Sequence, residues 1–289
     1  MSWKQSPPIR AAFWMIGTLT SFTLLAVSTR ELSFQLDTFE LVFYRSFLSL
    51  VVLDAFAKAI VRLPRLNFQK FRLQCLRNAF QFAGMSCWFF AIASIPLAQV
   101  FAFEFTTPLW VALMAAVYLK EPLTPVQLFS VALGAVGIFI VARPGQVEFT
   151  PGTWAAVFCA IGFAGSAVLT RKLTRYQGTI EILLWMLILQ SVAGLAVAGR
   201  DFELAVPSIN MALPLIVMSV AGVTAHYCLT KALSIAPAAA VAPIDFFRLP
   251  LIAVIGMLAY GEALELAVFA GGAIICVGNF LNVRSRIRI

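Results

Sequence analysis

Charged residues are scarce in this chain. Lysine, arginine, aspartate and glutamate make up 12% of its 289 residues, whereas an ordinary soluble domain has about 25%. Hydrophobic residues make up 61%, which excludes a soluble surface, a disordered chain and a disulfide scaffold. No polar stretch is long enough to form a separate soluble domain. The composition therefore predicts a protein embedded in a lipid bilayer.

Motifs of enzymes and ATP-driven pumps are also missing. There is no glycine-rich phosphate loop ending in Lys-Ser/Thr, no His-Glu-x-x-His and no Gly-x-Ser-x-Gly. The chain has one histidine, and its five cysteines show no paired spacing, so we expect them to be small core residues rather than metal ligands or disulfides. We therefore expect no metal, no cofactor and no catalytic residue, and a function that is not enzymatic.

Ten hydrophobic runs follow one another along the chain. They cover roughly 11–29, 38–57, 76–95, 97–119, 126–142, 152–170, 179–198, 211–233, 238–260 and 264–283. A helix that crosses a bilayer needs about 20 apolar residues, and helices are the default because backbone groups in lipid must all be paired. The sequence thus predicts an all-α membrane protein with ten transmembrane helices and both termini on one side.

The basic residues indicate which side that is. Sixteen lysines and arginines lie at the termini or around the loops that follow even-numbered runs, but only Arg30, Arg143 and Arg200 lie around the opposite loops. Lysine and arginine collect in cytoplasmic loops, so both termini are expected in the cytoplasm. The net charge of +8 then indicates membrane orientation, and no nucleic-acid partner is expected.

The second half of the chain repeats the first at an offset of about 141 residues. The matches include arginine, acidic, proline and glycine residues: Thr29-Arg30 with Thr170-Arg171, Glu40 with Glu181, Pro96 with Pro237, Glu104 with Asp245, Glu121 with Glu262, Gly137 with Gly278. An offset of five runs, an odd number, requires the second half to be inverted relative to the first. Inverted repeats are typical of secondary transporters, which bind substrate between the halves. We expect repeats over residues 1–144 and 145–289.

Four ionisable residues lie deep in the hydrophobic runs: Arg45, Glu104, Asp245 and Arg248. Each would cost about 2.5–3.5 kcal/mol if it faced lipid, so all four are expected to face the interior. Asp245 and Arg248 are three residues apart and share one face of a helix. Two interpretations remain open: ion pairs that only hold helices together, or a site for substrate or protons with Glu104 as the candidate proton carrier.

Other polar and aromatic side chains could line the same site. Gln81 and His226 lie at lipid depth, where they could contact substrate or simply bond a neighbouring helix. A lone histidine could also relay protons. Phe101 and Phe246 flank the buried acids and would suit a flat organic solute, although both could equally be core residues.

Several segments together resemble a known family. In the first half these are Ile95-Pro96-Leu97-Ala98, Pro108-Leu109-Trp110, Tyr118 to Thr124, Gly134 and Gly137. The second half has Ala236-Pro237, Pro250, Tyr260-Gly261-Glu262, Gly271 and Gly278 in the same order. The chain resembles two EamA domains of the drug/metabolite transporter superfamily over its whole length. Phe43-Tyr44-Arg45-Ser46 also resembles an arginine-bearing segment common in that group.

The resemblance implies ten helices, a central cavity and alternating access. It implies an inner-membrane transporter of a small organic metabolite, such as an amino-acid-like, nucleobase- or riboflavin-like, or S-adenosylmethionine-like compound, acting as a monomer or homodimer. The resemblance identifies neither the substrate of this chain nor the direction of transport. Two other functions remain open: a membrane-embedded enzyme acting on lipid, and a membrane sensor or scaffold that transports nothing.

Overall fold

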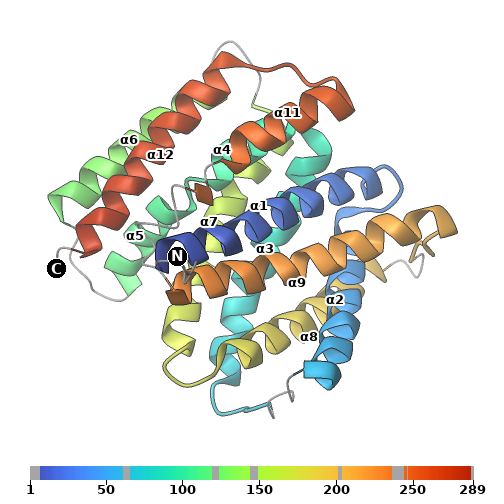
Figure 1. Cartoon of the computed structure of the whole chain (residues 1–289). Coiled ribbons are helices and arrows are strands. Elements are labelled where there is room, and N and C mark those ends of the chain that lie inside the picture. Colours follow the sequence, from blue (N-terminus) through green and yellow to red (C-terminus); the bar gives the residue numbers. More distant parts are fainter. Residues whose placement is uncertain are drawn as a thin grey trace, which may run out of the picture.

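The computed structural model describes residues 7–60, 66–118, 124–143, 149–200, 204–235, 244–245 and 247–287. Within these ranges every regular element is a helix (Figure 1). The elements are α1 Pro7–Leu32, α2 Thr38–Ile60, α3 Phe71–Ser94, α4 Leu97–Glu104, α5 Thr107–Tyr118, α6 Pro125–Ala142, α7 Pro151–Leu173, α8 Thr179–Ala198, η1 Ile209–Met211, α9 Ala212–Ile235, α11 Arg248–Tyr260 and α12 Leu266–Ile287.

Six segments of the described chain are long and apolar enough to cross a membrane. They are Arg10–Leu32, Leu97–Tyr118, Pro125–Ala142, Pro151–Leu173, Ile180–Ala198 and Ile209–Leu229. Two further apolar helices, Arg248–Tyr260 and Leu266–Asn282, are shorter. Helices α2 and α3 fall on expected runs but carry several charged or amide residues. The all-helical class is confirmed for the described residues, whereas the count of ten transmembrane helices stays a prediction.

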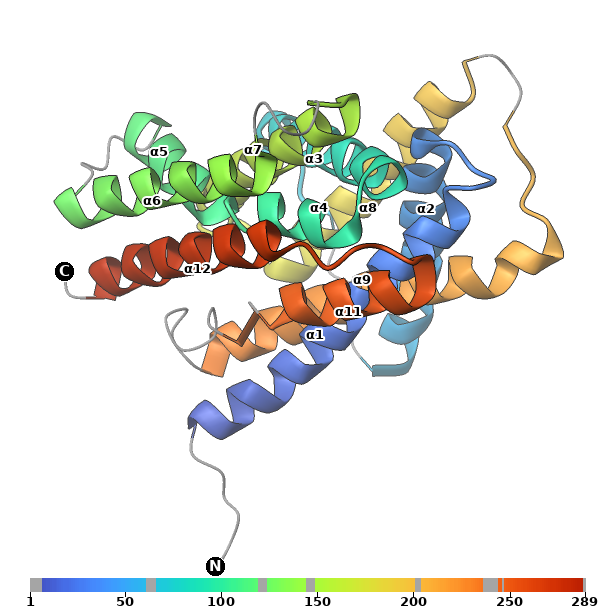
Figure 2. The same ribbon diagram turned by 90° about the horizontal axis from the view of Figure 1, so that it is seen from above.

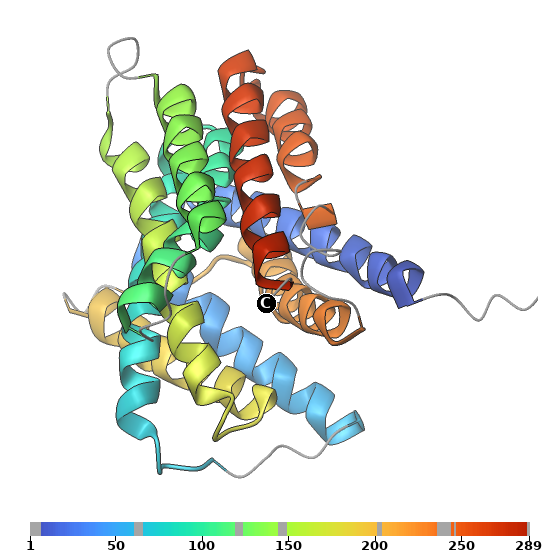
Figure 3. The same cartoon turned by 90° about the vertical axis from the view of Figure 1, so that its left-hand side faces the viewer.

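The most extensive helix contacts join a helix of one half of the chain to a helix of the other half. Helix α1 packs along α9, and α7 packs along α3 in the same way, so the first helix of each half lies against the third helix of the other. The remaining large contacts join α2 with α8 and α6 with α12. In Figure 1 the α6–α12 pair and the α2–α8 pair lie on opposite sides of the molecule. Figures 2 and 3 show the same separation from two other directions.

Glycines allow two helices to cross at matching points on α6 and α12. A Cβ on Gly137 would lie 2.8 Å from the carbonyl oxygen of Gly271, and a Cβ on Gly278 would lie 2.9 Å from that of Ser130. Gly137 and Gly278 are one repeat apart, as are Ser130 and Gly271. The two contacts are therefore equivalent, as expected when two similar halves pack around a pseudo-two-fold axis.

Two repeated acids hold the linkers of the opposite half. Glu40 at the start of α2 accepts hydrogen bonds from the backbone N–H of Asp37, at 2.9 Å, and of Ala205 in the α8–α9 linker, at 2.6 Å. Glu181 at the start of α8 accepts one from the backbone N–H of Asn67 in the α2–α3 linker, at 2.8 Å. Glu40 and Glu181, which occupy the same place in the two repeats, thus make equivalent hydrogen bonds to a linker of the other half.

The fourth hydrophobic run is not one continuous helix. It breaks at Phe105 and Thr106 into α4 and α5, and Pro108 lies in the first turn of α5. Pro250 lies likewise in the first turn of α11. Proline is tolerated there because its missing N–H would have had no partner inside the helix. Both prolines therefore begin a half-helix instead of kinking a continuous one.

Candidate functional site

A cavity of about 620 Å³ lies between the two halves and is bordered by residues from both. Its wall includes six of the eight side chains expected at the site: Arg45, Gln81, Glu104, His226, Asp245 and Arg248. They come from α2, α3, α4, α9, the first residue of α11 and the segment just before it. The volume falls within the range of about 300–1,000 Å³ that is typical of small-molecule sites.

Arg248 is shared between two carboxylates. Its Nη2 lies 3.1 Å from Glu104 Oε1 and 3.3 Å from Asp245 Oδ2. Its side chain is 4% exposed, against 15% for Glu104 and 25% for Asp245. The Asp245–Arg248 pair indicated by the spacing is present. Glu104 on α4 is a second partner, and Trp88 Nε1 donates to its other oxygen at 2.7 Å.

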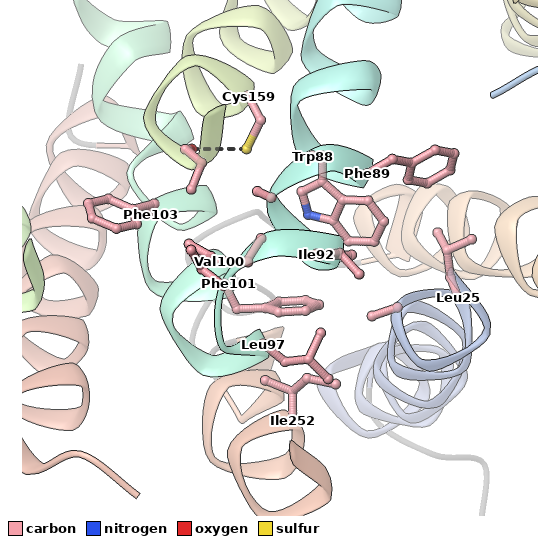
Figure 4. Packing of buried hydrophobic residues seen from close by; sticks show 14 of the residues in the cluster. Leu25, Trp88, Phe89, Ile92, Leu97, Val100, Phe101, Phe103, Cys159 and Ile252 are labelled. Atoms are coloured by element: carbon pink, nitrogen blue, oxygen red, sulfur yellow. Dashed lines mark hydrogen bonds between the residues drawn. The ribbon is translucent and has the colours of Figure 1, made fainter. Parts of the chain in front are cut away.

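Aromatic rings surround the Arg248 guanidinium. Its Cζ lies 4.6 Å from the ring centre of Phe22, 5.0 Å from that of Phe101 and 5.1 Å from that of Phe105. Phe22 and Phe105 border the cavity, whereas Phe101 is fully buried behind it. Figure 4 shows Phe101 between Leu97 and Trp88 in the core, so it supports the site without lining it.

Arg45 has no acidic partner among the described residues. It borders the cavity, is 1% exposed, and neither its Nε nor its Nη1 has a hydrogen-bond partner. Gly222 on α9 makes room for it, since a Cβ there would lie 3.2 Å from Arg45 Nη2. A buried cation without a partner costs several kcal/mol, so this side chain is unusual unless an anion binds to it.

Gln81 and His226 hold positions between helices as well as bordering the cavity. Ser166 Oγ on α7 donates to Gln81 Oε1 on α3 at 2.7 Å. The His226 ring on α9 packs edge-on against Phe22 on α1, with ring centres 5.5 Å apart. Both contacts join one half of the chain to the other. Phe246, the remaining expected site residue, lies outside the described residues, as do Glu121, Pro237 and Pro243.

Two asparagines of α12 also border the cavity and were not anticipated. Asn279 Nδ2 donates to the carbonyl oxygen of Phe105 at 2.5 Å, and Asn282 Nδ2 donates to that of Pro108 at 3.1 Å. Phe105 lies in the break between α4 and α5, and Asn279 on α12 pairs its carbonyl. Two asparagines three residues apart in an otherwise apolar run were the signal that could have indicated this role.

A polar network closes the space between α1 and the linkers before α4 and α12. Arg30 Nη2 donates to Glu262 Oε1 at 2.9 Å and to the carbonyl oxygen of Ile95 at 2.6 Å. Glu262 Oε2 accepts the backbone N–H of Leu97 at 2.9 Å. Burial raises the pKa of the Glu262 carboxyl, whereas the Leu97 N–H and the Arg30 charge lower it. Repeated residues Arg30 and Glu262 thus link the two halves at one end of the molecule.

No group of three histidine, cysteine, aspartate or glutamate side chains in the described part of the chain is arranged to hold a metal ion. The polar groups at the cavity are instead two guanidiniums, two carboxylates, amides and one imidazole. This donor set suits an organic solute with charged groups and an apolar body.

Comparisons with known proteins point to one family of transporters. A family model described as the EamA-like transporter family matches residues 9–143 and again residues 150–284. A riboflavin transporter of Brucella anthropi is 29% identical over 223 residues, which cover 76% of this chain and 78% of that protein. An S-adenosylmethionine uptake transporter of Rickettsia felis is 26% identical over 272 residues, covering 94% and 92%.

A pseudopaline exporter of Pseudomonas aeruginosa is 25% identical over 276 residues, covering 94% of this chain and 96% of that protein. One solved structure, described only as the crystal structure of a protein, superposes with a TM-score of 0.65 at 18% identity. It covers 96% of this chain and 98% of its own. The structural match supports the fold alone, and the relatives include both uptake and export proteins.

Proposed function

The chain belongs to the EamA-like transporter family, and on that premise we propose that it is a secondary transporter of the inner membrane that moves a small organic metabolite by alternating access. Multi-pass membrane insertion and a small-molecule substrate follow from the apolar helices and the transporter relatives. The single observation that carries the mechanism is the cavity between the halves with a buried, unpaired arginine in its wall.

The two halves are proposed to be inverted repeats, residues 1–144 and 145–289. The exchanged helix pairs and the equivalent glycine crossings of α6 and α12 support this proposal. Alternating access then requires rearrangement of contacts that join the halves around the cavity. The linkers held by Glu40 and Glu181 and the Arg30–Glu262 network are such contacts.

The described conformation fits an inward-facing state. Cavity residues on α7, α9 and α12, among them Ala167, His226 and Asn282, lie in the second half of each helix. The loop charges predict that these helices end on the cytoplasmic side. The Arg30–Glu262 network lies at the opposite end, which is the expected outer side, and it closes that end.

Cysteine labelling tests the orientation. Gln35, between α1 and α2, and Gln69, between α2 and α3, are both exposed. In a variant whose five native cysteines are replaced, Gln35→Cys should react with an impermeant reagent added to whole cells, and Gln69→Cys should react only after the membrane is opened. The reverse pattern would overturn the orientation, and outside labelling of both would overturn the order of spans.

Glu104 is the proposed proton carrier. Two carboxylates share one guanidinium at Arg248, so the three groups need one more positive charge, from a proton or from substrate, to be neutral. We expect Glu104→Gln to flatten the pH dependence of uptake, because the variant has no carboxyl group there to bind and release a proton. Asp245→Asn is the matched comparison, and an unchanged profile in Glu104→Gln would remove the proton role from that residue.

Counterflow in proteoliposomes tests the proposed function. Vesicles preloaded with an unlabelled metabolite should accumulate the labelled form from outside, and riboflavin, S-adenosylmethionine and amino acids form the first panel. Only a transporter does this; a lipid-acting enzyme would alter the vesicle lipids instead, and a sensor or scaffold would do neither. Protein-free vesicles are the control, and no counterflow across a broad metabolite panel would contradict the proposal.

A further inference from the structure

The cavity wall carries unlike charges in separate places. Arg45 lies on α2, whereas the ion-paired group comes from α4, from α11 and from Asp245 just before α11, and none of the ion pairs among the described residues includes Arg45. It contributes one positive charge with two donors, Nε and Nη1, that have no acceptor among the described residues. Guanidinium groups bind carboxylates and phosphates with paired hydrogen bonds. This part of the wall is therefore built for an anionic group.

The Glu104–Arg248–Asp245 group in the wall carries an excess of negative charge. With both acids ionised, Glu104, Arg248 and Asp245 sum to one negative charge, and Asp245 Oδ1 has no hydrogen-bond partner. Asn279, which also borders the cavity, has an Oδ1 without a hydrogen-bond partner among the described residues. Both atoms accept hydrogen bonds and neither donates. This part of the wall therefore suits a group that donates hydrogen bonds and carries positive charge.

Apolar and aromatic side chains make up another part of the cavity wall. Phe22, Met85, Trp88 and Phe163 all border it. Aromatic faces attract flat apolar groups and also stabilise cations near them. A solute that fills the space between Arg45 and Asp245 would therefore place an apolar or flat portion against these rings.

We propose that the substrate is a zwitterion with an anionic group bound by Arg45, a cationic group bound by the Glu104–Asp245 acids, and an apolar or flat portion between them. This assignment rests on the proposed transport function and specifies its substrate class. An uncharged solute would leave Arg45 buried and unpaired, and a simple cation would do the same. A simple anion would leave the excess charge at Glu104 and Asp245 unbalanced.

A set of matched compounds tests the assignment on the purified full-length protein. S-adenosylhomocysteine carries a carboxylate and an ammonium, whereas methylthioadenosine keeps the adenosine and thioether but has neither charge. Phenylalanine, phenethylamine and phenylpropionate form a second series that removes one charge at a time. Thermal shift and equilibrium binding are measured for each, with riboflavin as an uncharged aromatic comparison. Binding to the native state raises the melting temperature by mass action.

We expect the zwitterion of at least one series to bind about tenfold or more tightly than every relative that lacks a charge, a factor equivalent to about 1.4 kcal/mol. Equal binding of methylthioadenosine and S-adenosylhomocysteine, preferential binding of riboflavin, or no binding by any zwitterion would overturn the assignment. Counterflow of an uncharged compound would overturn it while leaving the transport function intact. Absence of counterflow with every compound of a broad panel would contradict both the zwitterion assignment and the transport function.

Two variants connect each charge of the ligand to its partner. Arg45→Gln should remove the discrimination between phenylalanine and phenethylamine, because only the carboxylate distinguishes them. Asp245→Asn should instead reduce the discrimination between phenylalanine and phenylpropionate, which differ in the ammonium; the same measurement on Glu104→Gln covers the case in which Asp245→Asn does not fold. S-adenosylhomocysteine and methylthioadenosine differ in both charges, so discrimination between them should fall in both variants. An equal loss of binding affinity for all compounds in both variants would contradict the assignment.

Discussion

Arg45→Ala is expected to abolish transport while the protein remains folded and inserted in the membrane. The side chain is buried at the cavity wall, and it makes no ion pair with any described residue. Its removal therefore breaks no protein contact of that kind and relieves the cost of an unpaired buried charge. Loss of activity without loss of stability is the pattern expected of a residue kept for its ligand. Uptake and the melting temperature are measured on the same preparation.

Arg77 provides a matched control for this experiment. It is also a buried arginine, 6% exposed, but its Nε donates to Thr170 Oγ1 at 3.0 Å and it does not border the cavity. We expect Arg77→Ala to lower the melting temperature, because it removes a bond between α3 and α7, and to retain transport per folded molecule. Arg45→Lys should recover little transport if paired donors matter. Normal uptake by Arg45→Ala would show that Arg45 is structural or peripheral.

The double variant Glu104→Gln/Asp245→Asn is expected to destabilise the protein far more than either single change. Each single change leaves Arg248 with one carboxylate, at 3.1 or 3.3 Å. The double change leaves this 3% exposed arginine without an acid, and an uncompensated buried charge costs about 3–5 kcal/mol. The loss of stability in the double variant should therefore exceed the sum of the losses in the two single variants, because the two acids share one partner.

Thermal melting of the four proteins in one detergent measures this coupling. A triple variant that also carries Arg248→Met tests the cause, since removal of the stranded charge should recover much of the lost stability. Additive losses in the single and double variants, or no recovery in the triple variant, would show that the shared ion pair does not hold the helices together. Folding defects in Asp245→Asn alone would show that Glu104 does not compensate.

Much of the fold could be predicted because it follows from local composition. The hydrophobic runs 38–57, 126–142 and 179–198 match α2, α6 and α8 within about three residues at each end. Helix α3 begins at Phe71, five residues before its expected run, because its first turn is polar and extends beyond the apolar stretch. The repeat was visible in the sequence since arginine, acidic and glycine residues recurred at equivalent points.

The details of the site could not be predicted, because they depend on how helices from opposite halves meet. Spacing indicated that Asp245 pairs with Arg248, since both lie on one helical turn. Nothing local could show that Glu104, 144 residues away, shares the same guanidinium. Phe101 and Phe105 lie one turn apart and looked alike, yet only Phe105 borders the cavity. Phe105 lies in the break after α4, so the packing of that break, which spacing alone does not show, brings it rather than Phe101 to the cavity.

The most direct test of the account is whether substrate protects the cavity. Ala167 on α7 borders the cavity and is exposed to it. In the cysteine-free background, Ala167→Cys should react with a small impermeant methanethiosulfonate reagent added from the cytoplasmic side. Saturation with the metabolite that gives counterflow should slow this reaction, whereas a cysteine at Gln69, outside the cavity, should be unaffected. If saturating substrate leaves the Ala167→Cys rate unchanged while counterflow persists, the cavity is not the transport site.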